Sequence, residues 1–139
     1  MAKKPARRQA RASAHGAKSL RARLQQERDA AIARLQQLRA SADLDESATV
    51  GGNESALDEG DAAQVSERRD VSFATRERLA RRVNQLTAAL ERLERDDYGR
   101  CTVCGHDIEP ERLAAIPEAA TCLACQERQE RGRAPGAVA

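Results

Sequence analysis

Four cysteines constrain this 139-residue chain more than any other feature. They form two Cys-x-x-Cys pairs, Cys101/Cys104 and Cys122/Cys125, with 17 residues between the pairs. This spacing is typical of a four-thiolate zinc site, because each short turn presents two sulfurs to one ion. Gly105 follows the first pair directly and suits such a turn, since glycine has the most permissive backbone. We therefore predict one structural zinc ion per chain, bound by all four thiolates.

Other readings of the cysteines are less favoured. A redox dithiol needs one pair rather than two, and nothing in the chain indicates the secreted context that disulfides prefer. His106 is a further candidate ligand, but with four thiolates already placed we expect it to face solvent. A filled site leaves no open position for a water molecule, and no nucleophile–base pair is visible, so we do not expect an enzyme.

The rest of the composition predicts long helices. The chain has one Phe, one Tyr and no Trp, and alanine makes up much of its 40% hydrophobic fraction, which cannot fill a large globular core. Two helical stripes are visible. The first consists of Leu20, Leu24, Ala31, Leu35 and Leu38, flanked by Ile32. The second follows heptad spacing, at Leu79, Val83, Leu86, Leu90 and Leu93.

These stripes predict a mainly α protein, with a long antiparallel coiled-coil hairpin arm and a small C-terminal four-cysteine zinc module. The second helix should run from about residue 61 to 97. Its heptad register becomes polar toward its start, so the arm should be best packed near the zinc module. The predicted parts are a basic, disordered tail (1–16), the arm (17–97) with an acidic tip around 41–61, the zinc module with a C-terminal helix (98–132), and a disordered tail (133–139).

Charge is unevenly distributed along the chain. Residues 1–23 contain eight basic side chains and no acid, and residues 41–61 contain seven acids and no base. The basic start either touches an acidic partner or nucleic acid, or only solubilises the chain. The acidic tip repels itself unless a cationic or metal-bearing partner receives it. Residues from Asp43 onward imitate a calcium loop, but Ala48 stands where that loop needs glycine. No apolar run is long enough to span a membrane. Reduced cysteines that form a zinc ligand set indicate a cytoplasmic protein.

Two separated motifs resemble the DksA/TraR family of bacterial transcription regulators. The zinc-finger motif comprises Tyr98-Gly99, Cys101, Cys104-Gly105, Ile108, Arg112-Leu113, Pro117, Cys122 and Cys125. The second is the Asp-x-x-Asp-x-Ala motif of the family's coiled-coil tip, present here from Asp58 to Ala63. The resemblance covers roughly residues 58–130.

This resemblance implies a regulator that binds RNA polymerase rather than specific DNA sequences. Its arm would enter the secondary channel of the polymerase, with Asp58 and Asp61 as effector residues and Ala63 keeping the turn slim. The family also binds guanosine tetraphosphate (ppGpp), and Arg78 matches one of the basic contact positions. Two others hold Gln85 and Gln126. Because an amide cannot replace an ammonium–phosphate pair, the resemblance does not extend to a full ppGpp site.

Two other classes of function stay open at this stage. One is a zinc-ribbon protein that binds nucleic acid, although the chain lacks aromatic side chains on which bases could stack. The other is a coiled-coil interaction protein in which zinc is purely structural. Capture of RNA polymerase by the tagged chain separates these alternatives from the regulator.

Overall fold

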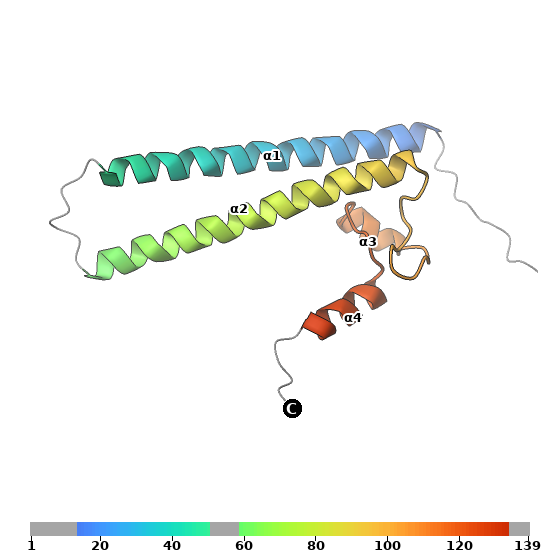
Figure 1. Cartoon of the computed structure of the whole chain (residues 1–139). Coiled ribbons are helices and arrows are strands. Elements are labelled where there is room, and N and C mark those ends of the chain that lie inside the picture. The colour runs from blue at the N-terminus through green and yellow to red at the C-terminus, as the bar shows by residue number, and fades with distance from the viewer. Residues whose placement is uncertain (1–13, 51–58, 134–139) are drawn as a thin grey trace, which may run out of the picture.

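The computed structural model describes residues 14–50 and 59–133. Within these ranges the chain forms four helices, α1 (Ala14–Val50), α2 (Glu59–Glu94), α3 (Pro110–Ala115) and α4 (Leu123–Arg133). The long helices α1 and α2 lie side by side as an antiparallel hairpin (Figure 1). At 1.5 Å per residue, the 36 residues of α2 make an arm about 54 Å long. The predicted mainly α fold, a hairpin arm with clustered C-terminal cysteines, is confirmed.

The helix bounds differ from the prediction at the far end of the arm. The apolar pattern of the first helix fades near Ser41, but α1 continues to Val50. No glycine or proline occurs between Ala17 and Val50, so nothing in the backbone ends the helix when its apolar stripe ends. Residues 43–47 are therefore helical, which rules out the calcium-loop reading of this stretch. The acidic residues predicted at a loop lie partly on the last turns of α1.

Both predicted stripes form the interface between the helices. Leu24 of α1 and Leu86 of α2 are fully buried, and Ala89 and Leu90 complete one core cluster with them. Ala31 and Leu35 continue the buried stripe along α1. Near the zinc module, Leu20, Leu93 and Tyr98 pack against the same cluster. The heptad positions thus pack as the sequence predicts.

Packing weakens toward the far end of the arm. The helices separate from one another in that direction (Figure 1). On α2, the seam positions there are Val65, Arg69, Ser72 and Arg76, and none of them is fully buried. An arginine at a seam position holds the helices apart, because its guanidinium resists burial without a partner. The arm is thus closely packed at one end and open at the other.

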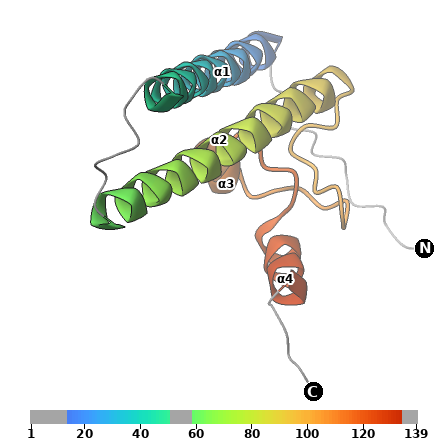
Figure 2. The same ribbon diagram turned by 60° about the vertical axis from the view of Figure 1, so that its left-hand side comes forward.

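The C-terminal module sits on the α2 side of the hairpin, beside the closely packed end. Figure 2 shows α3 next to α2 and α4 pointing away from the arm. Of the described helices, none is both long enough and apolar enough to cross a membrane. Most of the predicted tails (1–16 and 133–139) lies outside the described residues, as does Asp58 of the predicted tip, but residues 14–16 begin α1 and Arg133 ends α4.

Candidate metal centre and its attachment to the arm

The sulfurs of Cys101, Cys104, Cys122 and Cys125 converge on one point. All four are free thiols whose Sγ atoms lie within 4.8 Å of one another. The Cys104 and Cys122 sulfurs are 3.8 Å apart, which matches the edge of a tetrahedron with Zn–S bonds of about 2.3 Å. A bound ion would draw the wider edges inward by about 1 Å or less. The donor set and its geometry therefore fit zinc, with all four positions of a tetrahedron filled by protein.

Tight backbone turns bring the first cysteine pair into place. The amide of Gly105 donates to the Cys101 carbonyl (2.9 Å), and the amide of Cys101 donates to the carbonyl of His106 (2.8 Å). Gly105 has a φ of +74°, a conformation that a side chain would strain. The His106 side chain is exposed and is not part of the cysteine cluster, as the sequence predicted. The turn thus needs glycine for its backbone and leaves the histidine free of the site.

The second pair opens α4, with Cys125 in its first turn. Across the cluster, the Thr102 amide donates to the Ala120 carbonyl (2.9 Å), which ties the two cysteine segments together. Ile108 is buried between the cysteines, and Leu113 packs against it. Two segments far apart along the chain therefore form one small core around the sulfurs.

The protein environment acts unequally on the thiols. Hydrogen bonds from the backbone at Cys104 and Cys122 lower the pKa of Cys101 to about 6. Burial raises the pKa of Cys125 to about 11, and a hydrogen bond with the Cys122 side chain contributes in the same direction. A metal ion deprotonates its coordinating thiols, so zinc would remove this difference.

Arg128, one turn after Cys125, is a residue that our sequence reasoning missed. Its guanidinium donates to the Cys125 sulfur at 3.0 Å. This hydrogen bond to Cys125 is the main cause of the raised pKa of Arg128. A guanidinium in this position favours the thiolate that a metal needs. The available signal was its spacing, because residues three apart on a helix are neighbours.

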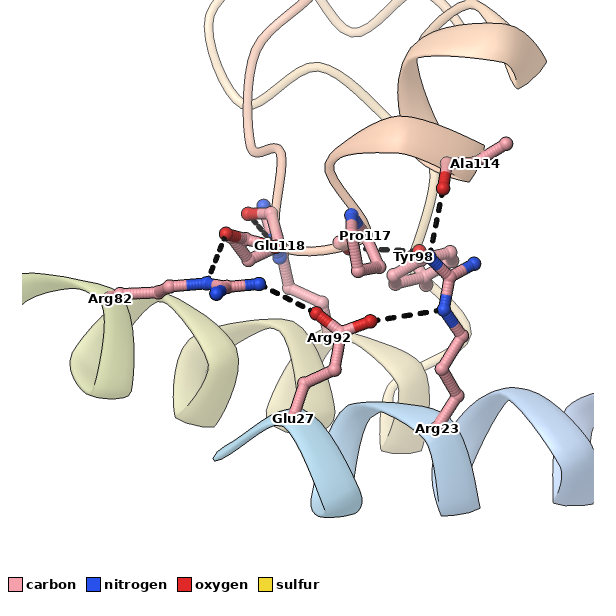
Figure 3. Close-up of polar contacts among 8 residues, drawn as sticks. All are labelled: Arg23, Glu27, Arg82, Arg92, Tyr98, Ala114, Pro117 and Glu118. Carbon is pink, nitrogen blue, oxygen red and sulfur yellow. Dashed lines mark hydrogen bonds and ion pairs between the residues drawn. The ribbon is translucent and has the colours of Figure 1, made fainter. Parts of the chain in front are cut away.

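A polar network attaches the module to both helices of the arm (Figure 3). Arg82 of α2 lies between two carboxylates: its Nη2 contacts Glu27 of α1 at 2.7 Å and its Nε contacts Glu118 of the module at 3.0 Å. Arg23 of α1 pairs with Glu27 at 3.1 Å and donates to the Ala114 carbonyl at 2.8 Å. The segment from α3 to Glu118 is thus held by both arm helices at once.

Two further hydrogen bonds reach the same segment. The Tyr98 hydroxyl donates to the carbonyl of the buried Pro117 at 2.8 Å, and Arg92 donates to the Glu118 carbonyl at 3.3 Å. Burial raises the pKa of Tyr98 and lowers that of Arg92. Both groups are therefore partly desolvated and depend on these partners.

Sequence comparison identifies the module. Residues 96–131 match the prokaryotic dksA/traR C4-type zinc finger. The structure of transcription factor DksA2 from Pseudomonas aeruginosa superposes with a TM-score of 0.65 and 31% sequence identity, covering 88% of this chain and 89% of that one. The likeness therefore includes the arm as well as the zinc finger. The chain belongs to the DksA/TraR family.

Curated relatives in the family match over a shorter range. The RNA polymerase-binding transcription factor DksA of Haemophilus influenzae is 33% identical over 73 residues, which are 52% of this chain and 50% of that protein. The protein of the same name from Caulobacter vibrioides is 35% identical over 78 residues, 56% of this chain and 55% of the relative. The chain thus spans about half the length of the curated relatives it matches.

The family's motif residues have visible structural roles here. Arg112 donates to the Thr121 carbonyl at 3.1 Å and to the side chain of Gln126. Gly99 has a φ of +82°, and the Leu113 side chain lies 3.5 Å from where a Cβ would stand. These residues, with the buried Ile108 described above, shape the module around its cysteines.

The residues predicted at the tip are not brought together with the metal centre. Asp61 and Ala63 are exposed near the start of α2, at the opposite end of that helix from the zinc module. Asp61 is the third residue of α2 and lies in its first turn. Arg78, matched to a ppGpp contact, is exposed along α2.

Proposed function

We propose that this protein binds RNA polymerase and modulates transcription initiation with the acidic tip of its arm. Family membership supports the proposal, and so do its curated relatives, which are named RNA polymerase-binding transcription factors. The observation that carries it is the shape of the chain. An arm about 54 Å long separates the cysteine cluster from Asp61, so two contacts with one large partner can be made far apart.

The zinc module would dock at the polymerase surface while the arm enters the secondary channel. Asp61 and Asp58 would then act near the catalytic magnesium, where carboxylates meet cations. Zinc would be structural, with one ion per chain, because four thiolates leave no position for a substrate or water. We therefore assign no enzymatic activity. A polymerase partner also implies a cytoplasmic protein.

Alarmone binding is not part of this proposal. Gln85 and Gln126 are neutral, and neither can supply the ammonium–phosphate contact that the family's motif implies. Gln126 is also occupied, since it accepts from Arg112 and donates to Glu130 at 2.7 Å. Arg78 alone is an exposed single charge, and solvent screens such a contact strongly.

Binding and cross-linking test the proposal together. The tagged, zinc-loaded chain should capture purified bacterial RNA polymerase. A photo-cross-linking residue in place of the exposed Ala62 should then attach to polymerase segments that line the secondary channel. The same residue in place of Arg81, in the middle of α2, provides the comparison. Failure to capture polymerase overturns the proposal, whereas capture without channel cross-links from position 62 overturns only the placement of the tip.

A further inference from the structure

The open half of the arm contains a groove with a net positive charge. Neither the zinc module nor the acidic tip accounts for that charge. The groove has a volume of about 360 Å³ and lies between α1 and α2. It is lined by Ser41, Ala42, Asp45, Val65, Arg68, Arg69, Ser72 and Arg76. Three arginines against one aspartate leave it with a net charge of +2. Nearby acids on the same turns, Asp43, Glu46, Glu67 and Asp70, are not among its lining residues.

The three arginines of this groove lack the carboxylate partners that several arginines near the zinc module have. In the closely packed half, Arg21, Arg23, Arg28 and Arg82 each pair with a carboxylate within 3.4 Å. Arg68, Arg69 and Arg76 form no ion pair with any residue that the structure describes. A cluster of like charges at a helix interface is unfavourable unless an anion neutralises it.

Arg76 is the clearest sign that an acceptor is missing. Its Nε is buried and has no hydrogen-bond partner among the described residues. Its guanidinium carbon lies 5.9 Å from the centre of the Phe73 ring, a contact that holds the side chain beside the groove. The hydroxyl of Ser72, one turn earlier and on the same lining, also lacks a partner in the described chain. Donors are therefore present in excess of acceptors.

We propose that this groove binds a phosphate group carried by a small phosphorylated molecule. A phosphomonoester carries nearly two negative charges at neutral pH, which matches the groove's net charge better than a carboxylate monoanion does. The guanidinium groups of arginine bind phosphate oxygens in a bidentate manner, and a serine hydroxyl can donate a further hydrogen bond to them. The groove lies between α1 and α2, away from the cysteine cluster, and this proposal does not rest on polymerase binding.

Titration of the full-length, zinc-loaded protein with inorganic phosphate at constant ionic strength tests this site. The side-chain Nε–Hε resonances of the arginines report binding by NMR. We expect saturable shifts, and weaker binding by about five- to tenfold in Arg69→Gln and in Arg76→Gln, because each removes one charge beside the anion. Asp45→Asn should change affinity in the opposite direction and bind about five- to tenfold more tightly.

Arg81→Gln is the matched control, since it removes an exposed arginine of the same helix that does not line the groove. It should leave phosphate affinity unchanged. Glutamine is a good helix former, so circular dichroism should show that each variant keeps its helices. Equal loss in Arg81→Gln and Arg69→Gln would mean diffuse attraction by the whole arm and would overturn the site. Absence of saturable shifts at millimolar phosphate would also overturn it.

Further ligands separate the chemistry of the anion from that of its carrier. Acetate should bind more weakly than phosphate, and equal binding of the two contradicts the assignment of a dianion. Phosphoserine and a nucleoside monophosphate carry the same phosphate group on different molecules. Whichever of the two binds more tightly than inorganic phosphate identifies the kind of molecule that carries the phosphate. Bound phosphate should also slow hydrogen exchange at residues 62–76, because a ligand of the folded arm stabilises it.

Discussion

Arg82 Nε lies 3.0 Å from Glu118 Oε1, and this ion pair joins the arm to the zinc module. The Glu118 side chain is only 10% exposed, whereas that of Arg82 is 44% exposed. The second carboxylate oxygen of Glu118 is buried without a partner among the described residues. Glu118 therefore depends on Arg82 more than Arg82 depends on Glu118, which retains Glu27 as a partner.

This asymmetry predicts the effect of removing the arginine. Arg82→Met keeps the aliphatic stem but leaves Glu118 without a charge partner. It should destabilise the protein by about 1–2 kcal/mol, which is the contribution of a hydrogen bond between charged groups, reduced because Arg82 is partly exposed to solvent. Denaturant unfolding measures the change. In a double-mutant cycle with Glu118→Gln the losses should be non-additive. Arg95→Met, which removes an exposed pair with Glu91, should cost less than about 0.5 kcal/mol, and an equal cost would contradict the argument.

The cysteine cluster predicts the metal content. Purified protein should contain one zinc per chain by elemental analysis. Cys101→Ser or Cys122→Ser should release the metal and unfold the module, because binding and folding of such a site are coupled. Helicity of the arm should fall much less, since α1 and α2 have their own core. Metal-free protein with persistent disulfides under reducing conditions would rule out the zinc site.

Arg128 predicts a graded effect on the same metal. Arg128→Gln removes the guanidinium that donates to the Cys125 sulfur, so zinc affinity should fall about tenfold while the fold is retained. Competition with a chelator measures the affinity. Arg131→Gln, on the same helix but paired with Glu127, is the control and should bind zinc as the unaltered chain does. Equal zinc affinities in the two variants would show that the Arg128 contact does not contribute to metal binding.

The arm should be unevenly stable. Leu86→Ala removes a fully buried side chain and should cost about 2–5 kcal/mol, whereas Val65→Ala at the open end should change stability little. Hydrogen exchange should be faster at residues 62–72 than at residues 79–93. Uniform protection along α2 would show that the open end is as well packed as the other and would contradict the prediction.

The tip predicts a separation of binding from activity. Asp61→Asn should leave polymerase affinity nearly unchanged and weaken the effect on open-complex lifetime in transcription assays. Asp61 lies in the first turn of α2, so losing its charge there also costs about 0.3–1 kcal/mol of helix stability. Asp70→Asn makes the same chemical change at an exposed position farther along α2. If the two variants regulate alike, the tip mechanism loses its support.

Local chemistry made much of this protein readable from its sequence. The cysteine spacing predicted the ligand set, the heptad positions predicted which leucines of α2 face α1, and Gly105 was expected at the turn where its φ is positive. Each of these features depends on residues close together in the chain or on a simple period. The end of α1 was predicted wrongly because that prediction relied on the apolar period alone. The loss of an apolar stripe marks where packing ends, whereas a helix stops only where the backbone or a cap ends it.

The attachment of the module and the charge of the groove were decided by tertiary structure. The sequence shows that Glu27 is a polar residue between Leu24 and Ala31 on the apolar stripe. It does not show its partner, because Arg82 is 55 residues away along the chain. Nothing local indicates that Arg82 also contacts Glu118, or that Arg69 and Arg76 line a groove with α1 and form no ion pair with the residues described there. Such pairings depend on how two helices align over their full length and on where the module docks. The sequence by itself determined the elements and the metal ligands, and the packing of those elements decided which charges are paired.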